Sequence, residues 1–321
     1  MTRPSAVPPP VTAVLDASSR WLPARLGEVE EHLRAQSRGH GDLLSEDLAT
    51  TLAAGGKRLR PLLVLLCAGA DGGEEAVRAA TAIELVHMAT LIHDDVLDAA
   101  PLRRGQPTIA AVSGRARATA AGDLLFARAF ALLAGQGDGR SVALLAEASA
   151  ALARGELAQR QDAYNLEISE QRYLDRCRLK TAKLFECACR MGTDSEALGA
   201  FGAEIGLAFQ LLDDVLDVSG PPERTGKARG TDLLDGTVTL PLIVAAASDP
   251  SLRAGDLREL NPAAAEELCD RIAATGALDR VRSRALEMVA AAKARLEAAP
   301  FDPEQRQLLW LVADGVVQRY S

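Results

Sequence analysis

Apolar residues recur at three- and four-residue spacing along almost the whole chain from about Thr12 onward. This spacing places apolar side chains on one face of an α-helix, and the abundant Ala, Leu, Arg and Glu are strong helix formers. Segment 77–93 is apolar around much of its circumference, so it is expected to be a central helix. Segment 203–217 reads as another helix of this kind. The pattern therefore predicts an all-α protein of many helices.

Glycine and proline interrupt the helical pattern at 70–75, 135–140, 219–230 and 247–251. No alternating run of useful length predicts a strand. The nearest, 237–244, is expected to open a helix near Pro241, because proline suits a first helical turn. Residues 1–12 are predicted to be a flexible Pro-rich tail. Residues 13–321 are predicted to form a single all-α domain, because no shift in composition marks a second one.

Charge and composition exclude several classes of function. The net charge of −8 argues against a nucleic-acid binder driven by phosphate contacts. No apolar run approaches the roughly 20 residues that span a bilayer, and proline stands where a signal peptide needs its apolar core. The five cysteines form no CxxC pair, which predicts buried free thiols in a reducing compartment. A cytoplasmic protein without an integral membrane segment is expected.

The same five residues, DDVLD, follow two apolar segments, at 94–98 and at 213–217. On a helix, the first and last aspartates of each cluster lie one turn apart on one face. Carboxylates in this arrangement can share Mg²⁺, which prefers oxygen ligands and often also binds substrate phosphates. Either cluster alone could be a solvated acidic helix end. Two clusters that both follow apolar segments favour one cavity that binds several divalent cations and a polyphosphate.

Basic side chains in other motifs could complete the site for such an anion. GGKRLRP places Lys57, Arg58 and Arg60 just after a glycine pair, as an anion-binding loop would. The further basic motifs are RRGQPT at 103–108, KTAKLF at 180–185 and TGKARGTDLLDG at 225–236. Any one of them alone would be read as a solvated surface group. Together with the acidic clusters they predict a site for two diphosphates.

In order and spacing these motifs resemble those of the trans-isoprenyl diphosphate synthases, also called polyprenyl synthetases. The resemblance runs from about Ser45 to the C-terminus, and includes the FQ before the second acidic cluster, GKxxGxDL and TLP. It implies the isoprenoid synthase fold, a helical bundle around a central cavity. It also implies a Mg²⁺-dependent prenyltransferase that condenses isopentenyl diphosphate with an allylic diphosphate.

The resemblance implies a role for individual residues as well. Asp94, Asp98 and Asp213 would hold the metal, supported by Asp95, Asp214 and Asp217. The allylic diphosphate would be bound by Arg103, Lys180, Gln210 and Lys227. The diphosphate of isopentenyl diphosphate would be bound by Lys57, Arg60, His87 and Arg104. The catalytic set would comprise Asp94, Asp98, Asp213, Lys180 and Thr181, with Thr181 close to the forming bond.

The implied cofactor is a set of about three Mg²⁺ ions, with Mn²⁺ as an alternative. The implied allylic starter is geranyl, farnesyl or geranylgeranyl diphosphate, and the implied assembly is a homodimer. Thr237 departs from the family pattern, because many short-chain members carry a lysine there. His93 is expected to orient the acidic helix end rather than to act as a catalytic acid.

Product length is expected to depend on the residues one turn or more before Asp94. Farnesyl-forming relatives tend to carry bulky aromatics there, whereas Ala89 and Thr90 leave this chain-length floor open. With a rise of about 1.5 Å per residue, these two residues lie roughly 6–7.5 Å below Asp94. The open floor resembles that of long-chain bacterial members, and it predicts an all-trans product of thirty carbons or more, for quinone side chains. A geranylgeranyl or farnesyl diphosphate synthase is the alternative. A class I terpene cyclase is disfavoured by the second diphosphate site, and a non-catalytic regulatory subunit of a heteromeric synthase by the presence of all six aspartates.

Overall fold

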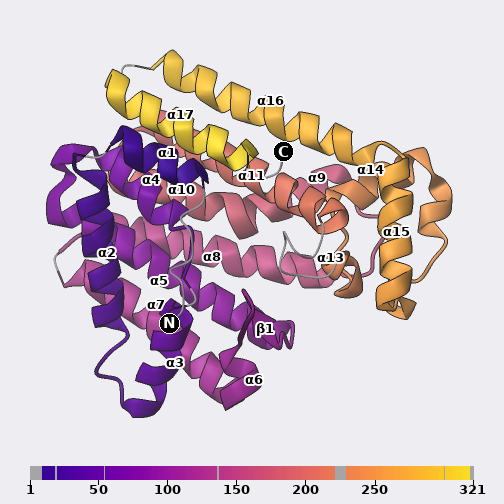
Figure 1. Cartoon of the computed structure of the whole chain (residues 1–321), viewed down its shortest axis with the longest axis horizontal. Coiled ribbons are helices and arrows are strands. Elements are labelled where there is room, and N and C mark those ends of the chain that lie inside the picture. Colours follow the sequence, from indigo (N-terminus) through magenta and orange to yellow (C-terminus); the bar gives the residue numbers. More distant parts are fainter. Residues whose placement is uncertain are drawn as a thin grey trace. The chain divides into compact units, whose positions relative to one another are not determined.

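The computed structural model describes residues 9–18, 20–53, 55–135, 137–220, 229–299 and 301–318, with only the backbone at 9–12, 42 and 43. Within these ranges the regular secondary structure is helical apart from one short hairpin, with loops and turns between the helices (Figure 1). The prediction of an all-α protein is confirmed. Contacts divide the chain into two compact units, which are described one at a time. Whether the two units together form one domain is not tested by these contacts, so the single domain over residues 13–321 stays a prediction.

The first unit comprises Met1–Ser149, Cys187–Gly199 and Phe301–Gly315. Its complete helices are α1 (Pro9–Ala17), α2 (Leu22–Gln36), α3 (Asp42–Ala53), α4 (Leu59–Ala68), α5 (Gly73–Leu97), α6 (Ile109–Ser113) and α7 (Arg115–Ala134). Helix α5 lies at the centre, packed against α7, α4 and α2. Because it is buried on most sides, its apolar residues are not confined to one stripe. The prediction of a central helix over 77–93 is confirmed.

A two-stranded antiparallel hairpin follows α5, with β1 at Leu102–Arg103 and β2 at Gln106–Pro107. Its loop residues, Arg104 and Gly105, both have positive φ, at 53° and 74°. Two successive left-handed residues are the requirement of a tight type I′ turn, which joins strands with their natural twist. The sequence contained no run long enough to predict these strands.

The second unit comprises Ala150–Glu186, Ala200–Pro300 and Val316–Ser321. Its complete helices are α9 (Glu170–Cys177), α13 (Thr231–Leu234), α14 (Leu240–Ser248), α15 (Pro262–Ala274) and α16 (Ala277–Glu297). The π-helical turn Arg178–Ala182 continues α9. Helix α14 packs against α16, α15 and α9. Pro241 lies in the first turn of α14, as predicted for the segment 237–244.

Four helices contribute residues to both units: α8 (Gly139–Gln161), α10 (Lys183–Gly192), α11 (Glu196–Ser219) and α17 (Pro303–Gln318). Helix α11 contains the predicted segment 203–217 and ends where the predicted Gly- and Pro-rich break begins. The breaks after α7 and α14 also fall where the glycines and prolines indicated.

The N-terminal boundary differs from the prediction. Helix α1 begins at Pro9, whereas the flexible tail was predicted to extend to residue 12. Prolines 9 and 10 are compatible with the start of a helix, because the first helical N–H groups have no partner within the helix. Residues 1–8 lie outside the described part of the chain.

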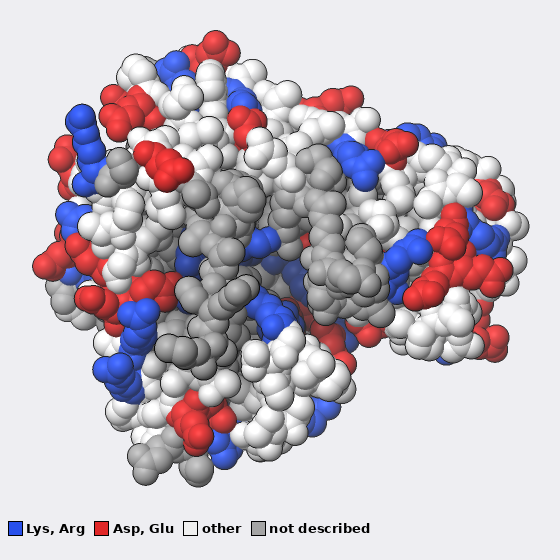
Figure 2. Space-filling model, viewed as in Figure 1, with Lys and Arg blue, Asp and Glu red and all other residues white. Residues whose placement is uncertain are grey.

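All five cysteines are buried and free, as predicted. No helix among the described residues is long and apolar enough to cross a membrane. On the face shown in Figure 2, acidic and basic side chains are interspersed. Ion pairs with an exposed acid occur among the described residues, for example that of Arg282 with Asp279 at 2.8 Å. Local pairing of this kind contributes little stability, about 1 kcal/mol or less.

Candidate active site

The first acidic cluster lies at the C-terminal end of α5. Asp94 is half-buried, and Asp98 caps the helix, with its N–H donating to the Asp94 carbonyl at 2.8 Å. Asp95 is only 6 % exposed. Carboxylates are unfavourable at this end of a helix, where the dipole is negative, and neighbouring carboxylates add repulsion. A bound cation would offset both costs.

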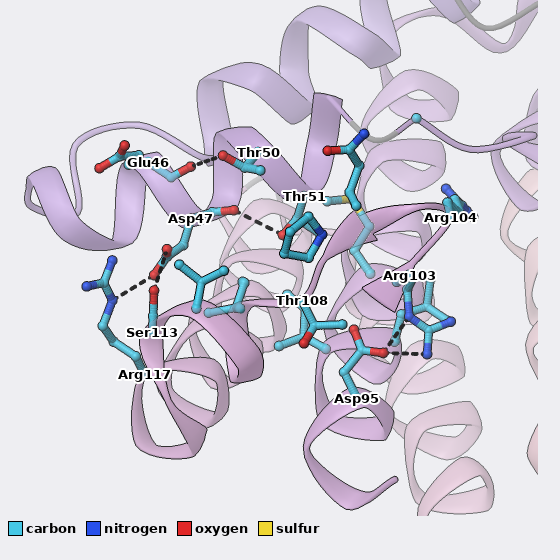
Figure 3. Close-up of a pocket in the computed structure, with 18 of the residues that line it drawn as sticks. Glu46, Asp47, Thr50, Thr51, Asp95, Arg103, Arg104, Thr108, Ser113 and Arg117 are labelled. Atoms are coloured by element: carbon cyan, nitrogen blue, oxygen red, sulfur yellow. Dashed lines mark hydrogen bonds and ion pairs between the residues drawn. The ribbon is translucent and has the colours of Figure 1, made fainter. Parts of the chain in front are cut away.

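Arg103 of the hairpin binds Asp95. Its Nε and Nη2 atoms both lie 2.7 Å from Asp95 Oδ1 (Figure 3). This ion pair fixes the hairpin to the end of α5 and neutralises the buried member of the acidic cluster. Asp94 and Asp98 are the members with greater solvent exposure.

The GGKRLRP loop leads into α4 through a left-handed residue, Arg58, at φ 49°. Arg58 donates to Glu84 on α5 at 2.7 Å and to Glu30 on α2 at 2.6 Å. The sequence grouped Arg58 with the anion-binding cations, but here it joins the loop to two helices. Glu84 is 3 % exposed, so its charge depends on this partner.

Removal of the Glu84 carboxylate is expected to destabilise the first unit strongly. Glu84→Ala would leave the largely buried Arg58 guanidinium without one of its two carboxylates. We expect the free energy of unfolding to fall by about 3 kcal/mol, measured by urea denaturation. The control is Glu74→Ala, whose ion pair with Arg78 has an 86 % exposed carboxylate, with an expected loss below about 1 kcal/mol. Equal small losses in the two variants would contradict a supporting role for Glu84.

Arg104, at the tip of the hairpin, approaches the same loop. A Cβ atom on Gly56 would lie 3.2 Å from Arg104 Nη1 and 3.1 Å from Arg58 Nη1. Glycine at position 56 therefore gives two guanidinium groups room beside the backbone. Arg58 and Arg104 both have left-handed backbones, which non-glycine residues adopt at a cost. Such strain is commonly found at functional sites.

His87 of α5 stands among these cations. Burial lowers its pKa well below 6.5, and the positive charges of Arg60, Arg104, Arg103 and Arg58 lower that pKa further. Burial also lowers the pKa of Arg60, to about 10, which leaves it charged near neutral pH. The structure thus brings together His87 and the arginines that the sequence assigned to one diphosphate. His87 would contribute a neutral hydrogen-bonding group there.

The pKa of His87 predicts how stability depends on pH. Below about pH 6.5 the unfolded chain binds a proton at this histidine while the folded chain does not, so stability falls as the pH drops. We expect His87→Gln to reduce this loss, because glutamine has no basic group. Urea denaturation of the wild-type chain and of His87→Gln at about pH 7.5 and about pH 5.5 measures this loss of stability. An identical pH dependence in the two proteins would mean that His87 is readily protonated in the fold.

A cavity of about 380 Å³ opens beside this cluster, within the first unit (Figure 3). His87, Arg103 and Arg104 line one part of it. Met88, Leu91, Ile92, Ile109 and Val112 supply apolar lining. At the α3 side, Asp47 is held by Arg117 at 2.7 Å and by Ser113 at 3.1 Å. The lining combines cations for a diphosphate with apolar carbon for a short hydrocarbon group.

The second acidic cluster lies near the end of α11, in the second unit. Asp213 is exposed, whereas Asp214 is 2 % exposed. Burial and the charges of Asp232 and Asp213 raise the pKa of Asp214 to about 8, against hydrogen bonds from Tyr173 and Gln210 that lower it. Asp217 accepts from the Asp232 N–H at 3.2 Å. The exposed Asp213 is thus the member with most access to a ligand.

Lys180 and Thr181 lie on the π-helical turn Arg178–Ala182. π-turns within helices are rare and are frequent at functional sites. Thr181 Oγ1 donates to Gln210 Oε1 at 2.8 Å, and Lys180 forms an ion pair with Glu156 on α8. A Cβ atom on Gly155 would lie 2.5 Å from the backbone nitrogen of Lys180. Only glycine therefore permits α8 to approach the π-turn this closely.

The two predicted floor residues lie on α5, and Thr237 precedes α14. Ala89 is fully buried in α5, and Thr90 is half-buried with its hydroxyl donating to the His87 carbonyl at 2.7 Å. Thr237 is half-buried, and its N–H donates to the Asp232 carbonyl at 2.8 Å. Lys227 lies outside the described residues.

His93 packs across to α7. Its ring stacks on Phe126 at 5.8 Å, and its Nε2 lies 3.3 Å from both the Thr119 carbonyl and Asp123 Oδ1. A Cβ atom on Gly122 would lie 2.2 Å from the ring, so glycine is required beneath it. These contacts join α5 to α7 just before the acidic cluster, and the orienting role of His93 stays a prediction.

The donors in both acidic clusters are carboxylate oxygens, which suit a hard divalent cation such as Mg²⁺. Within the described ranges, no group of three or more His, Cys, Asp or Glu side chains is arranged so that it could hold a metal ion by itself. Mg²⁺ commonly takes one or two carboxylates and completes its shell with water and substrate phosphates. The clusters belong to different units, so their meeting around one cavity stays a prediction.

Three supporting residues were missed from the sequence: Glu84, Glu156 and Tyr173. Glu84 could have been noticed, because it is an isolated acid inside the apolar run 77–93. Gly155 directly before Glu156, within a helical pattern, was a weaker signal of close packing. Nothing in the sequence distinguished Tyr173.

Comparison with known proteins agrees with this architecture. The family model described as Polyprenyl synthetase matches residues 42–272. Heptaprenyl diphosphate synthase component 2 of Geobacillus stearothermophilus is 41 % identical over 243 residues, 72 % of this chain and 75 % of that protein. Geranylgeranyl diphosphate synthase of Methanosarcina mazei is 33 % identical over 281 residues, 83 % of this chain and 86 % of that one.

A solved structure of a similar protein superposes over the whole chain. It is the polyprenyl synthase from Caulobacter crescentus complexed with calcium and isoprenyl diphosphate, with a TM-score of 0.89, 34 % identity and full coverage of both chains. The fold is thus that of an all-α prenyltransferase. The chain belongs to the polyprenyl synthetase family. It is a trans-prenyl diphosphate synthase, and such enzymes use a divalent metal with diphosphate substrates.

Proposed function

We propose that this chain is a Mg²⁺-dependent synthase of long-chain all-trans polyprenyl diphosphates, of about thirty carbons or more. The proposed product length rests on one observation. The side chain at position 89 is small, and it lies with Thr90 just before Asp94 on α5. A product of this length would suit the side chain of a quinone. Similarity alone does not select the length, because relatives with heptaprenyl and geranylgeranyl products both match.

The first chemical step breaks the allylic C–O bond, and the electron pair leaves with the diphosphate. Mg²⁺ at Asp94, Asp98 and Asp213 would offset the charge that develops on this leaving group. Lys180 would bind the same diphosphate, exchanging its ion pair with Glu156 for a substrate phosphate. Arg103 and Gln210 would also bind this diphosphate. In the structure Arg103 is paired with Asp95, and Gln210 donates to Asp214.

The second step forms the new C–C bond. The double bond of isopentenyl diphosphate attacks the allylic carbocation, and holding the two close reduces the entropic cost of their meeting. Lys57, Arg60, Arg104 and neutral His87 would fix the isopentenyl diphosphate. The proton then lost from the new chain would pass to the departed diphosphate, so no protein base is required. The isopentenyl double bond is itself the nucleophile, so no protein nucleophile is required either. Thr181 would lie beside the forming bond.

The proposal is tested with the purified chain, Mg²⁺, radiolabelled isopentenyl diphosphate and each of three starters, geranyl, farnesyl and geranylgeranyl diphosphate. Products are dephosphorylated and sized by thin-layer chromatography and mass spectrometry. We expect products of about thirty carbons or more, from about six five-carbon units, and dependence on added Mg²⁺. A product that stops at geranylgeranyl or farnesyl length would overturn the long-chain assignment while leaving the prenyltransferase class intact.

We also propose that the chain acts as a homodimer. One similar relative is named as component 2 of its enzyme, so the single chain must be assayed alone. Light scattering coupled to gel filtration gives the mass of the assembly. Activity of this pure species as a dimer is the expected result, whereas activity only after addition of a second, different chain would indicate a heteromeric enzyme.

A further inference from the structure

Tyr173 of α9 is a buried tyrosine with a specific polar partner. It is 1 % exposed, and its hydroxyl donates to Asp214 Oδ2 at 2.5 Å. Asp214 directly follows Asp213, the exposed aspartate of the second cluster. The other oxygen of Asp214 accepts from Gln210 Nε2 at 2.7 Å. Both carboxylate oxygens of Asp214 thus have hydrogen-bond donors inside the second unit.

The same network continues to the π-helical turn. Gln210 uses its amide group to donate to Asp214 and its carbonyl to accept from Thr181 at 2.8 Å. Thr181 neighbours Lys180 on that turn. The hydrogen bonds therefore link α9, α11 and the π-turn in one series: Tyr173, Asp214, Gln210 and Thr181. Tyr173, Asp214 and Thr181 are buried, and Gln210 is half-buried. A hydrogen-bonded network of largely buried groups favours one arrangement of the elements that it joins.

Two residues with predicted roles at the allylic diphosphate are attached to this network. Asp213 precedes Asp214 on α11, and Lys180 precedes Thr181 on the turn. A shift of α11 against the turn would separate a metal ligand from a diphosphate-binding cation. Small displacements of positioning groups are costly in catalysis, because the productive geometry is narrow.

We propose that Tyr173 is a positioning residue, which acts through Asp214 to hold Asp213 and Lys180 in register for the allylic diphosphate. Asp214 serves in this arrangement as an anchor for α11, and Asp213 serves as the ligand. The isopentenyl diphosphate site of the first unit is not part of this network. The inference rests on the proposed function, because it assumes that Asp213 and Lys180 bind one substrate.

The test is Tyr173→Phe, which keeps the ring and removes the hydroxyl. We expect the KM for the allylic diphosphate and the Mg²⁺ concentration for half-maximal activity each to rise about tenfold, which is about 1.4 kcal/mol. The KM for isopentenyl diphosphate is expected to change by less than about twofold. The control is Tyr164→Phe, which removes a phenol hydroxyl elsewhere in the same unit, with unchanged kinetics expected.

A double-mutant cycle with Asp214→Asn shows whether Tyr173 acts through Asp214. The double variant is expected to be no more impaired than Asp214→Asn alone. If Tyr173→Phe folds poorly, Asp214→Asn is assayed in its place for the same allylic-specific loss. The inference is overturned if the effects multiply, if both substrates are affected alike, or if the KM values stay at wild type. Absence of prenyltransferase activity in the wild-type chain would instead defeat the proposed function.

Discussion

The double variant Asp94→Ala, Asp213→Ala is expected to lose elongation almost completely under saturating Mg²⁺. Each aspartate is the first of its acidic cluster, and each would hold metal against the charge on the leaving diphosphate. Loss of one such stabilising group costs about a hundred- to a thousandfold in rate. We therefore expect kcat/KM for the allylic substrate to fall by more than about a thousandfold, measured by incorporation of radiolabelled isopentenyl diphosphate.

The control removes one exposed acid from each unit, with the substitutions Asp71→Ala and Asp279→Ala. Near wild-type activity is expected, since neither lies in an acidic cluster or a basic motif of the site. Thermal unfolding of both double variants checks that the fold is retained. Elongation that survives nearly intact in Asp94→Ala, Asp213→Ala would show that these clusters do not bind the catalytic metal.

Enlarging position 89 is expected to shorten the product. Ala89 lies five residues, about 7.5 Å along the helix axis, before Asp94. In the series Ala89→Val, Ala89→Leu and Ala89→Phe, we expect the longest product to shrink with each step. Phenylalanine should stop the chain at about twenty carbons or fewer, because a bulky side chain fills the space into which a growing tail would extend. Mass analysis of dephosphorylated products provides the measurement.

Overpacking must be separated from chain-length control in this series. Ala89 is fully buried, so an aromatic ring there also strains the packing of α5, at about 1–3 kcal/mol. Thr90→Phe is the companion variant, because Thr90 is only half-buried and lies one turn from Asp94. The rate of the first condensation and the thermal midpoint are measured for each variant. Unchanged product length in both phenylalanine variants would mean that neither residue limits growth.

Much of the fold followed from local information. The apolar periodicity located α5 and α11, and glycine and proline marked where α7, α11 and α14 end. These signals are local because a helix satisfies its backbone hydrogen bonds within itself. The hairpin of residues 102–107 escaped prediction because two-residue strands carry no periodic pattern. Its shape depends instead on two left-handed residues at the turn.

The sequence predicted less of the candidate site where the site depends on which side chains form ion pairs and hydrogen bonds with one another. The acidic and basic motifs could be recognised as groups, but the partner of each charge is set by tertiary packing. Arg58 illustrates the limit, since the motif suggested an anion-binding cation and the fold surrounds it with Glu30 and Glu84. Asp214 illustrates it as well, because Tyr173 donates to it from α9, a helix distant from α11 in sequence.

The π-helical turn has a consequence for how this sequence can change. A turn closed by i→i+5 hydrogen bonds contains one residue more than a regular α-turn, so α9 and α10 are offset by one position across it. Deletion of one residue within 178–182 would permit an uninterrupted α-helix and better backbone geometry. It would also rotate one flanking helix by about 100° relative to the other. The positions of Lys180 and Thr181 thus depend on the length of this turn, and we expect neither an insertion nor a deletion there to be compatible with activity.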